Sequence, residues 1–108
     1  MEDCMRTEIT FRHFDTVPSL KEHASRRLDK LSKIYDGITD ARVVLDYEPV
    51  EASRKSAEIS LAVYRQILTA RDSAETHEEA INRCVAQLRR QIMRYKAKLR
   101  SVDKDVHH

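Results

Sequence analysis

Residues that shape or break the backbone are scarce in this 108-residue sequence. Gly37 is the only glycine, there are two prolines, and tryptophan is absent. A single glycine cannot form a glycine-rich phosphate-binding loop, so nucleotide-binding motifs of that type are excluded. The longest uncharged stretches, such as Ile59–Tyr64, are far too short to span a bilayer. We therefore expect no membrane partner.

Cysteine and histidine are also few, and they are not spaced as ligands. Cys4 and Cys84 stand in unrelated contexts, and of the five histidines only His107 and His108 are adjacent. No disulfide framework, metal-ligand set or nucleophile–base pair can be assigned. We expect no cofactor, no metal, no small-molecule substrate and no enzymatic activity. Because the first residues are acidic and polar, unlike an export signal, we expect a cytoplasmic protein.

Positive charge is concentrated near the end of the chain. The net charge is only +2, yet Gln87–Arg100 contains six Lys or Arg residues and no acid. Removing these six charges from +2 leaves a net charge of −4 on the remaining ninety-four residues. A concentrated positive face on an otherwise acidic body is typical of selective binding to a polyanion.

The spacing of apolar residues predicts four strands and two helices. Strict alternation indicates strands at Arg6–Arg12, Ala41–Glu48, Ser56–Tyr64 and Gln66–Asp72, with an exposed loop at Pro49–Lys55 and a tight turn near Arg65. In the first strand Thr7, Ile9 and Phe11 share a face. In the last strand Leu68 and Ala70 are expected inward, although Ile67 and Thr69 fit the alternation equally well. Between the first two strands the spacing is helical. Pro18 suits the first turn, Gly37 is placed to stop the helix, and the apolar face comprises Leu20, Ala24, Leu28, Leu31 and Tyr35.

The last helix has the clearest start signal. The run from Thr76 to Glu79 is a capping box, in which the Thr76 hydroxyl and the Glu79 carboxylate satisfy each other's backbone donors. Its apolar stripe is Ile81, Cys84, Val85, Leu88, Ile92, Tyr95 and Leu99. The order β-α-β-β-β-α predicts an α+β fold with a four-stranded mixed sheet, its first two strands parallel, and two helices on one face. We place the domain at residues 1–100 and a short polar tail at 101–108.

Both helices carry basic residues away from or beside their apolar stripes. Arg27 lies within the stripe of the first helix, so its stem should pack while its guanidinium reaches outward. Most charge runs on helices are simply solvated faces. Such faces usually carry both acidic and basic residues, whereas Arg83–Arg100 contains no acid. The pattern therefore favours a two-helix basic platform that binds phosphate. Its outer and flanking members are Arg26, Lys30, Lys33, Arg83, Arg89, Arg90, Arg94, Lys96 and Lys98.

Aromatic residues are not placed on this platform. By helical phase, Tyr35 and Tyr95 face the core, where they serve packing rather than base stacking. Recognition of single strands by stacking is therefore weakly supported. Shape and phosphate reading of structured RNA fits the pattern better.

The sequence resembles the ribosome hibernation promoting factors, a family that includes the ribosome-associated inhibitor called protein Y. The resemblance spans about Ile9 to Leu99. It rests on VPSLKEHASRRLDKLSKIYDGI, on ARVVLDYE, on the strand pair ending in LTARDSAE, and most of all on AINRCVAQLRRQIMRYKAKL. It implies the same β-α-β-β-β-α fold, similar to a double-stranded-RNA-binding domain.

The resemblance also implies a partner and a site. Such proteins sit on the small ribosomal subunit, in the channel used by mRNA and tRNA, where basic residues of both helices contact 16S rRNA. We therefore expect a cytoplasmic, ribosome-associated protein that binds the small subunit and the 70S ribosome and silences translation. The family's basic pattern is matched by Lys21, Arg27, Lys30, Lys33, Arg90, Arg94, Lys96 and Lys98, and the helical wheel adds Arg26, Arg83 and Arg89.

Some features depart from the family pattern. Gln87 stands where lysine is common, which weakens one possible phosphate contact. His77-Glu78 replaces a usual Met-Tyr, and we expect this to change packing at the helix start. Residues 101–108 are too few for the linker and second domain of long members, so we expect a short form or an isolated N-terminal domain. Two other functions stay open: a general structured-RNA binder or RNA chaperone, and a protein-interaction module that pairs through an edge strand.

Overall fold

The computed structural model describes residues 5–48 and 54–106. The elements are β1 (Arg6–Arg12), α1 (Pro18–Ile34), β2 (Asp40–Glu48), β3 (Arg54–Val63), β4 (Gln66–Ala74) and α2 (His77–Val106). This confirms the predicted order β-α-β-β-β-α.

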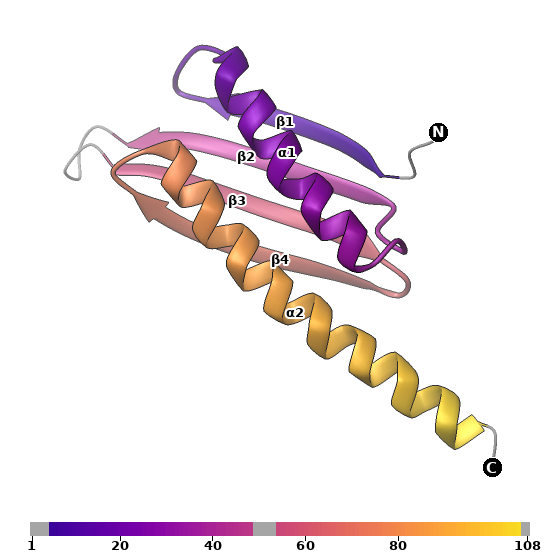
Figure 1. Ribbon diagram of the computed structural model, residues 1–108. Coiled ribbons are helices and arrows are strands. Elements are labelled where there is room, and N and C mark those ends of the chain that lie inside the picture. The colour runs from indigo at the N-terminus through magenta and orange to yellow at the C-terminus, as the bar shows by residue number, and fades with distance from the viewer. Residues whose placement is uncertain (1–4, 49–53, 107–108) are drawn as a thin grey trace.

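The strands form one mixed sheet in the order β1-β2-β3-β4. β1 runs parallel to β2, with Ile9 beside Val43, and the other two pairs are antiparallel. Parallel neighbours cannot be joined by a tight turn, so α1 carries the chain back across the sheet. Figure 1 shows α1 and α2 on the same face of the sheet, as predicted.

The core lies between this face and the two helices. In β4, Leu68 and Ala70 point inward as predicted, while Ile67 is 67% exposed. In β1, Ile9 is partly buried, but Thr7 is exposed at the start of this edge strand. Both helices bury their predicted stripes except at the last residue of each: Tyr35, which follows the end of α1, and Leu99 are only partly buried. The largest fully buried side chains are Leu28, Leu31, Ile38, Val43, Leu45, Ile59, Leu61, Ile81, Cys84, Leu88 and Ile92.

The hairpin strands begin and end at residues other than those predicted. β3 begins at Arg54, so Arg54 and Lys55 extend the strand instead of belonging to the predicted loop. The rest of that loop, residues 49–53, lies outside the described residues. Tyr64, predicted as the last strand residue, joins Arg65 in the tight turn, where Arg65 has a φ of 65°.

α2 is longer than the sequence analysis predicted. It continues to Val106, so residues 101–106 are helical instead of forming a tail. The segment contains neither proline nor glycine, and nothing in it ends a helix. Figure 1 shows this part of α2 extending beyond the sheet. No helix within the described ranges is both long and apolar enough to cross a membrane.

The end of α1 is not the predicted glycine stop. The C-cap residue is Tyr35, whose backbone is extended and whose N–H donates to the Leu31 carbonyl at 3.2 Å. Gly37 does not adopt a left-handed conformation. A Cβ at Gly37 would instead collide with the ring of Tyr35. Glycine is needed here because the aromatic ring approaches closely, not because of a left-handed cap.

The start of α2 is capped by half of the predicted box. The Glu79 N–H donates to the Thr76 hydroxyl at 3.1 Å. The Glu79 carboxylate, predicted to bind the backbone of Thr76, accepts from Arg83 instead, at 2.9 Å. One reciprocal bond is thus replaced by an i,i+4 ion pair, which stabilises the same first turns.

His77 joins the start of α2 to the sheet and to the chain between β1 and α1. It is 5% exposed, its Nε2 donates to the Asp46 carbonyl at 2.8 Å, and its ring stacks on Phe14 with 4.5 Å between centroids. The Asp46 carboxylate accepts from His13 Nδ1 at 2.7 Å, and this bond holds the pKa of Asp46 below its usual value. His77, one of the two residues that depart from the family pattern at the helix start, thus packs on Phe14 and binds the sheet.

The same substitution on the two faces of the sheet tests this arrangement. Ile59→Thr buries a hydroxyl and removes a methyl group in the core, so we expect a loss of about 2–4 kcal/mol of unfolding free energy. Ile67→Thr keeps a β-branched residue on the exposed face, so we expect a change of about 0.5 kcal/mol or less. Urea denaturation measures both values, and equal losses would contradict the assigned faces.

Candidate nucleic-acid interface

The two helices lie side by side and run in the same direction, as Figure 1 shows. Near their starts, His23 Nε2 donates to the side-chain oxygen of Asn82 at 3.0 Å. At the end of α1, the Ile34 carbonyl accepts from the Lys96 ammonium of α2 at 2.9 Å. Polar contacts therefore join α1 to α2 at both ends of their common length.

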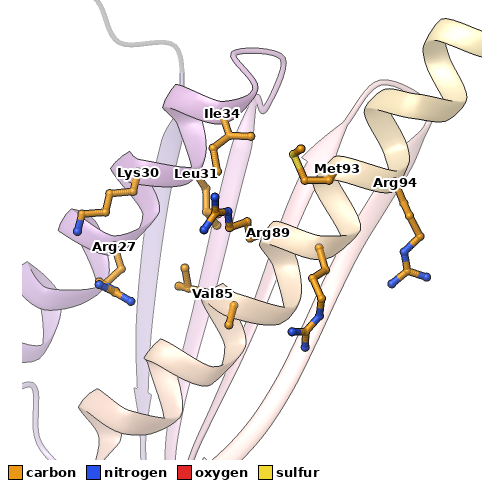
Figure 2. A pocket seen from close by; sticks show the side chains of 10 residues that line it. Arg27, Lys30, Leu31, Ile34, Val85, Arg89, Met93 and Arg94 are labelled. Carbon is orange, nitrogen blue, oxygen red and sulfur yellow. The ribbon is translucent and has the colours of Figure 1, made fainter.

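Between these contacts lies a groove of about 890 Å³, shown in Figure 2. We call it the interhelix groove. Figure 2 shows the side chains of Arg89 and Met93 pointing from α2 toward α1. Its ten lining residues include no acid. Its five basic members are Arg27 and Lys30 from α1 and Arg89, Arg90 and Arg94 from α2.

The charge in the interhelix groove is not neutralised by its own surroundings. None of the five cations pairs with a carboxylate of the residues that the structure describes. Arg27 packs its stem as predicted, and its Nε is buried without a hydrogen-bond partner among those residues. Like charges on facing helices repel, and an unsatisfied buried donor is unfavourable. A bound polyanion would relieve the repulsion among these cations.

The floor of the interhelix groove is apolar, which the sequence analysis missed. Met93 is 52% exposed although it is large and hydrophobic. It lies outside the predicted apolar stripe of α2. The sequence did contain a signal for this: Met93 stands four residues after Arg89, so the two side chains lie on the same side of α2. The apolar lining residues are Leu31, Ile34, Val85, Ala86 and Met93.

Four other predicted site residues are exposed but do not line the interhelix groove. Each extends the positive surface of its helix, and none of them makes an ion pair with a carboxylate of the described residues. They are Lys21, Arg26 and Lys33 on α1 and Lys98 on α2.

Two predicted site residues are held by contacts within the protein. Arg83 binds the Glu79 carboxylate at 2.9 Å and the Ser73 carbonyl at 3.1 Å. The expected lack of any internal partner along Arg83–Arg100 is therefore wrong at Arg83, because a carboxylate one turn earlier reaches it. Lys96 binds the end of α1, at the Ile34 carbonyl. Both side chains hold α2 in place and are less available to a ligand.

The side of α2 away from α1 covers the edge strand β4. Arg83 donates to the carbonyl of Ser73 and Gln91 to that of Thr69, at 3.0 Å for Gln91. Gln87 donates to the Asp72 carboxylate at 3.0 Å, so this departure from the family pattern binds the sheet. Side chains that occupy the free carbonyls of an edge strand hinder pairing with another strand. This observation disfavours β4 as the edge of a protein-interaction module.

The two tyrosines of the helices serve packing, as predicted. Tyr95 is 6% exposed and its hydroxyl donates to the Tyr64 carbonyl at 2.7 Å. Its ring meets that of Tyr35 edge to face, with 5.6 Å between centroids. Neither ring lines the interhelix groove.

Sites for other chemistry are not evident in the part of the chain that the structure describes. No group of three or more His, Cys, Asp or Glu residues there could hold a metal ion. Cys84 is fully buried, its Sγ donates to the Ala57 carbonyl at 3.2 Å, and burial raises the pKa of its thiol to about 12. Such a thiol is not a nucleophile near neutral pH.

The fold and the groove define an α+β domain with two basic helices on one face of a mixed sheet, and solved structures share this fold. A ribosomal subunit interface protein from Coxiella burnetii superposes with a TM-score of 0.77 and 16% identity, covering 85% of this chain and 98% of that one. The N-terminal domain of Protein Y from Thermus thermophilus gives a TM-score of 0.73 and 22% identity, covering 82% and 94%.

Sequence comparison shows the family. The model of the Sigma 54 modulation protein / S30EA ribosomal protein family matches residues 7–100, and the chain belongs to this family. A ribosome hibernation promoting factor from Acidithiobacillus ferridurans is 30% identical over 57 residues, which are 53% of this chain and 73% of that protein.

The burial of Cys84 leads to a chemical prediction. In a Cys4→Ser variant at pH 8, we expect Ellman's reagent to react with Cys84 at least about a hundredfold more slowly in the native than in the unfolded protein, because the buried thiol is not ionised. Absorbance of the released thiolate measures both rates. Comparable rates in the two states would contradict the burial.

Proposed function

We propose that this protein is a ribosome hibernation factor, which binds the small ribosomal subunit through the interhelix groove and the adjoining basic helix faces. Bound there, it blocks the channel of mRNA and tRNA and silences translation by occupancy, without catalysis. The observation that carries the proposal is the row of five cations on facing helices, lining a groove without an acid. Family membership and the hibernation factor among its relatives support the same partner.

The physical basis of binding is the release of counterions from RNA. Each phosphate that a lysine or arginine neutralises frees condensed cations, and this favours the complex most at low salt. Because the cations come from two parallel helices, they present a surface instead of a line. Such a surface can contact phosphates on both sides of a groove in folded rRNA.

Co-sedimentation separates this proposal from a general RNA binder. Purified small subunits, large subunits and 70S ribosomes are each incubated with the protein, with and without an excess of duplex RNA. Selective retention on small subunits and 70S ribosomes, resistant to the duplex, is the expected result. Equal binding to any RNA would instead support a general structured-RNA binder or RNA chaperone.

Salt dependence gives the first quantitative prediction. If about four to six phosphates are neutralised, affinity for the small subunit should fall by roughly a hundredfold or more between about 50 and 200 mM monovalent salt. Magnesium is held constant so that the ribosome itself is unchanged. Sedimentation or fluorescence anisotropy measures the dissociation constant, and a flat salt profile would reject binding through the groove cations.

Charge reversal gives the second prediction. Arg90→Glu with Arg94→Glu places negative charges at the groove, so we expect affinity and inhibition of translation to fall by on the order of a hundredfold. Lys30→Glu with Lys33→Glu should act similarly from α1. An in vitro translation assay measures the inhibition, and circular dichroism shows whether each variant remains folded.

The matched control makes the same charge change on the opposite side. Arg42 and Arg71 are exposed, and each directly neighbours a buried core residue in its strand, Val43 in β2 and Ala70 in β4, so both lie on the sheet face opposite the core. Arg42→Glu with Arg71→Glu should therefore leave inhibition close to that of the parent, apart from a small long-range effect. Equal losses in the groove and control variants would mean that net charge matters and the groove does not.

A further inference from the structure

We propose that the interhelix groove holds one unstacked nucleotide of the bound RNA, with its base on the apolar floor and its phosphates on the basic walls. This inference rests on the proposed function. Beyond that function, it specifies the RNA feature that the groove recognises, which is a bulged or looped nucleotide and not a continuous duplex.

The apolar floor is the first reason. A regular A-form duplex presents phosphates and ribose hydroxyls at its surface, and these groups gain nothing from contact with aliphatic carbon. Met93 nevertheless stands 52% exposed among the cations. Figure 2 shows it opposite Ile34, across the groove. A planar base would cover this apolar surface, and the methionine sulfur contacts aromatic rings favourably.

The placement of the arginines is the second reason. Arg27 and Arg89 come from opposite helices, and Figure 2 shows the Arg89 guanidinium extending into the space between them. Guanidinium planes stack on unpaired bases and also donate to their edges. Arg27 lines the groove from α1, although its buried Nε is not itself accessible to a ligand. Lys30, Arg90 and Arg94 remain for the flanking phosphates.

The size and rigidity of the groove are the third reason. Its volume of about 890 Å³ lies within the range of small-ligand sites, roughly 300–1,000 Å³. The His23–Asn82 and Lys96–Ile34 hydrogen bonds, one at each end of the groove, fix the distance between α1 and α2. A groove whose helices are already held in place before binding needs little rearrangement of its backbone, which favours affinity.

Three RNAs that differ in one position test the inference. The first is a perfect duplex, the second carries one bulged nucleotide, and the third has an abasic residue at that bulge. The bulged and abasic RNAs have the same phosphates, so only the base differs. We expect the bulged RNA to bind about five- to a hundredfold more tightly than the abasic one, the range typical of stacking one base.

Variants locate the base within the groove. Met93→Ala keeps the charges and the helix propensity of α2 but removes part of the floor. It should lose most of the preference for the bulged base while binding the perfect duplex like the parent. Ile67→Ala is the matched control, because Ile67 is also a large exposed hydrophobic residue and belongs to β4, outside the groove. It should keep the full preference.

The outcomes distinguish this inference from the proposed function. Equal affinity for the bulged and abasic RNAs, or a preference that survives Met93→Ala, would overturn the nucleotide site. If the same protein still sediments with small subunits, the proposed function stands without it. If it fails to bind ribosomes at all, the proposed function fails, and with it the inference.

Discussion

The parallel pairing of β1 with β2 is the constraint from which the rest of the architecture follows. Two adjacent parallel strands require a crossover, and α1 supplies it on one face of the sheet. Once α1 covers half of that face, the remaining apolar residues of β3 and β4 must be covered by α2. The two helices therefore become neighbours, and every basic residue on their adjoining sides becomes part of one surface.

The neighbouring helices place charges where folding alone would not favour them. Arg27 and Lys30 from α1 and Arg89 and Arg90 from α2 line the interhelix groove, and its lining residues include no acid. The apolar stripes below hold the helices together, with Leu28, Leu31, Ile81, Leu88 and Ile92 fully buried. The core thus supplies the stability of the fold, despite the repulsion among the cations of the groove. A bound polyanion would relieve this repulsion. Sites of this kind commonly sacrifice some stability for binding.

The two flanks of α2 have different roles although both are polar. On one flank, Arg83, Gln87 and Gln91 bind the carbonyls and the carboxylate of β4. On the other, Arg89 and Met93 face α1. The first flank covers a sheet edge that could otherwise pair with another chain, and the second forms the groove. A single helix therefore both closes the sheet and presents the candidate site.

Periodicity in the sequence was enough to predict the element order and the buried stripes, because both depend on local spacing. It did not decide the face of the last strand, where Ile67 and Thr69 fitted the alternation as well as Leu68 and Ala70. Periodicity also placed basic residues on both helices. Tertiary structure alone decided which of them share a site, because pairing depends on neighbours distant in sequence. Arg83 and Lys96 are held by Ser73 and Ile34, contacts that no helical wheel contains. Likewise, Met93 became part of an apolar floor only when α1 was placed beside it, and Gly37 owes its presence to the ring of Tyr35.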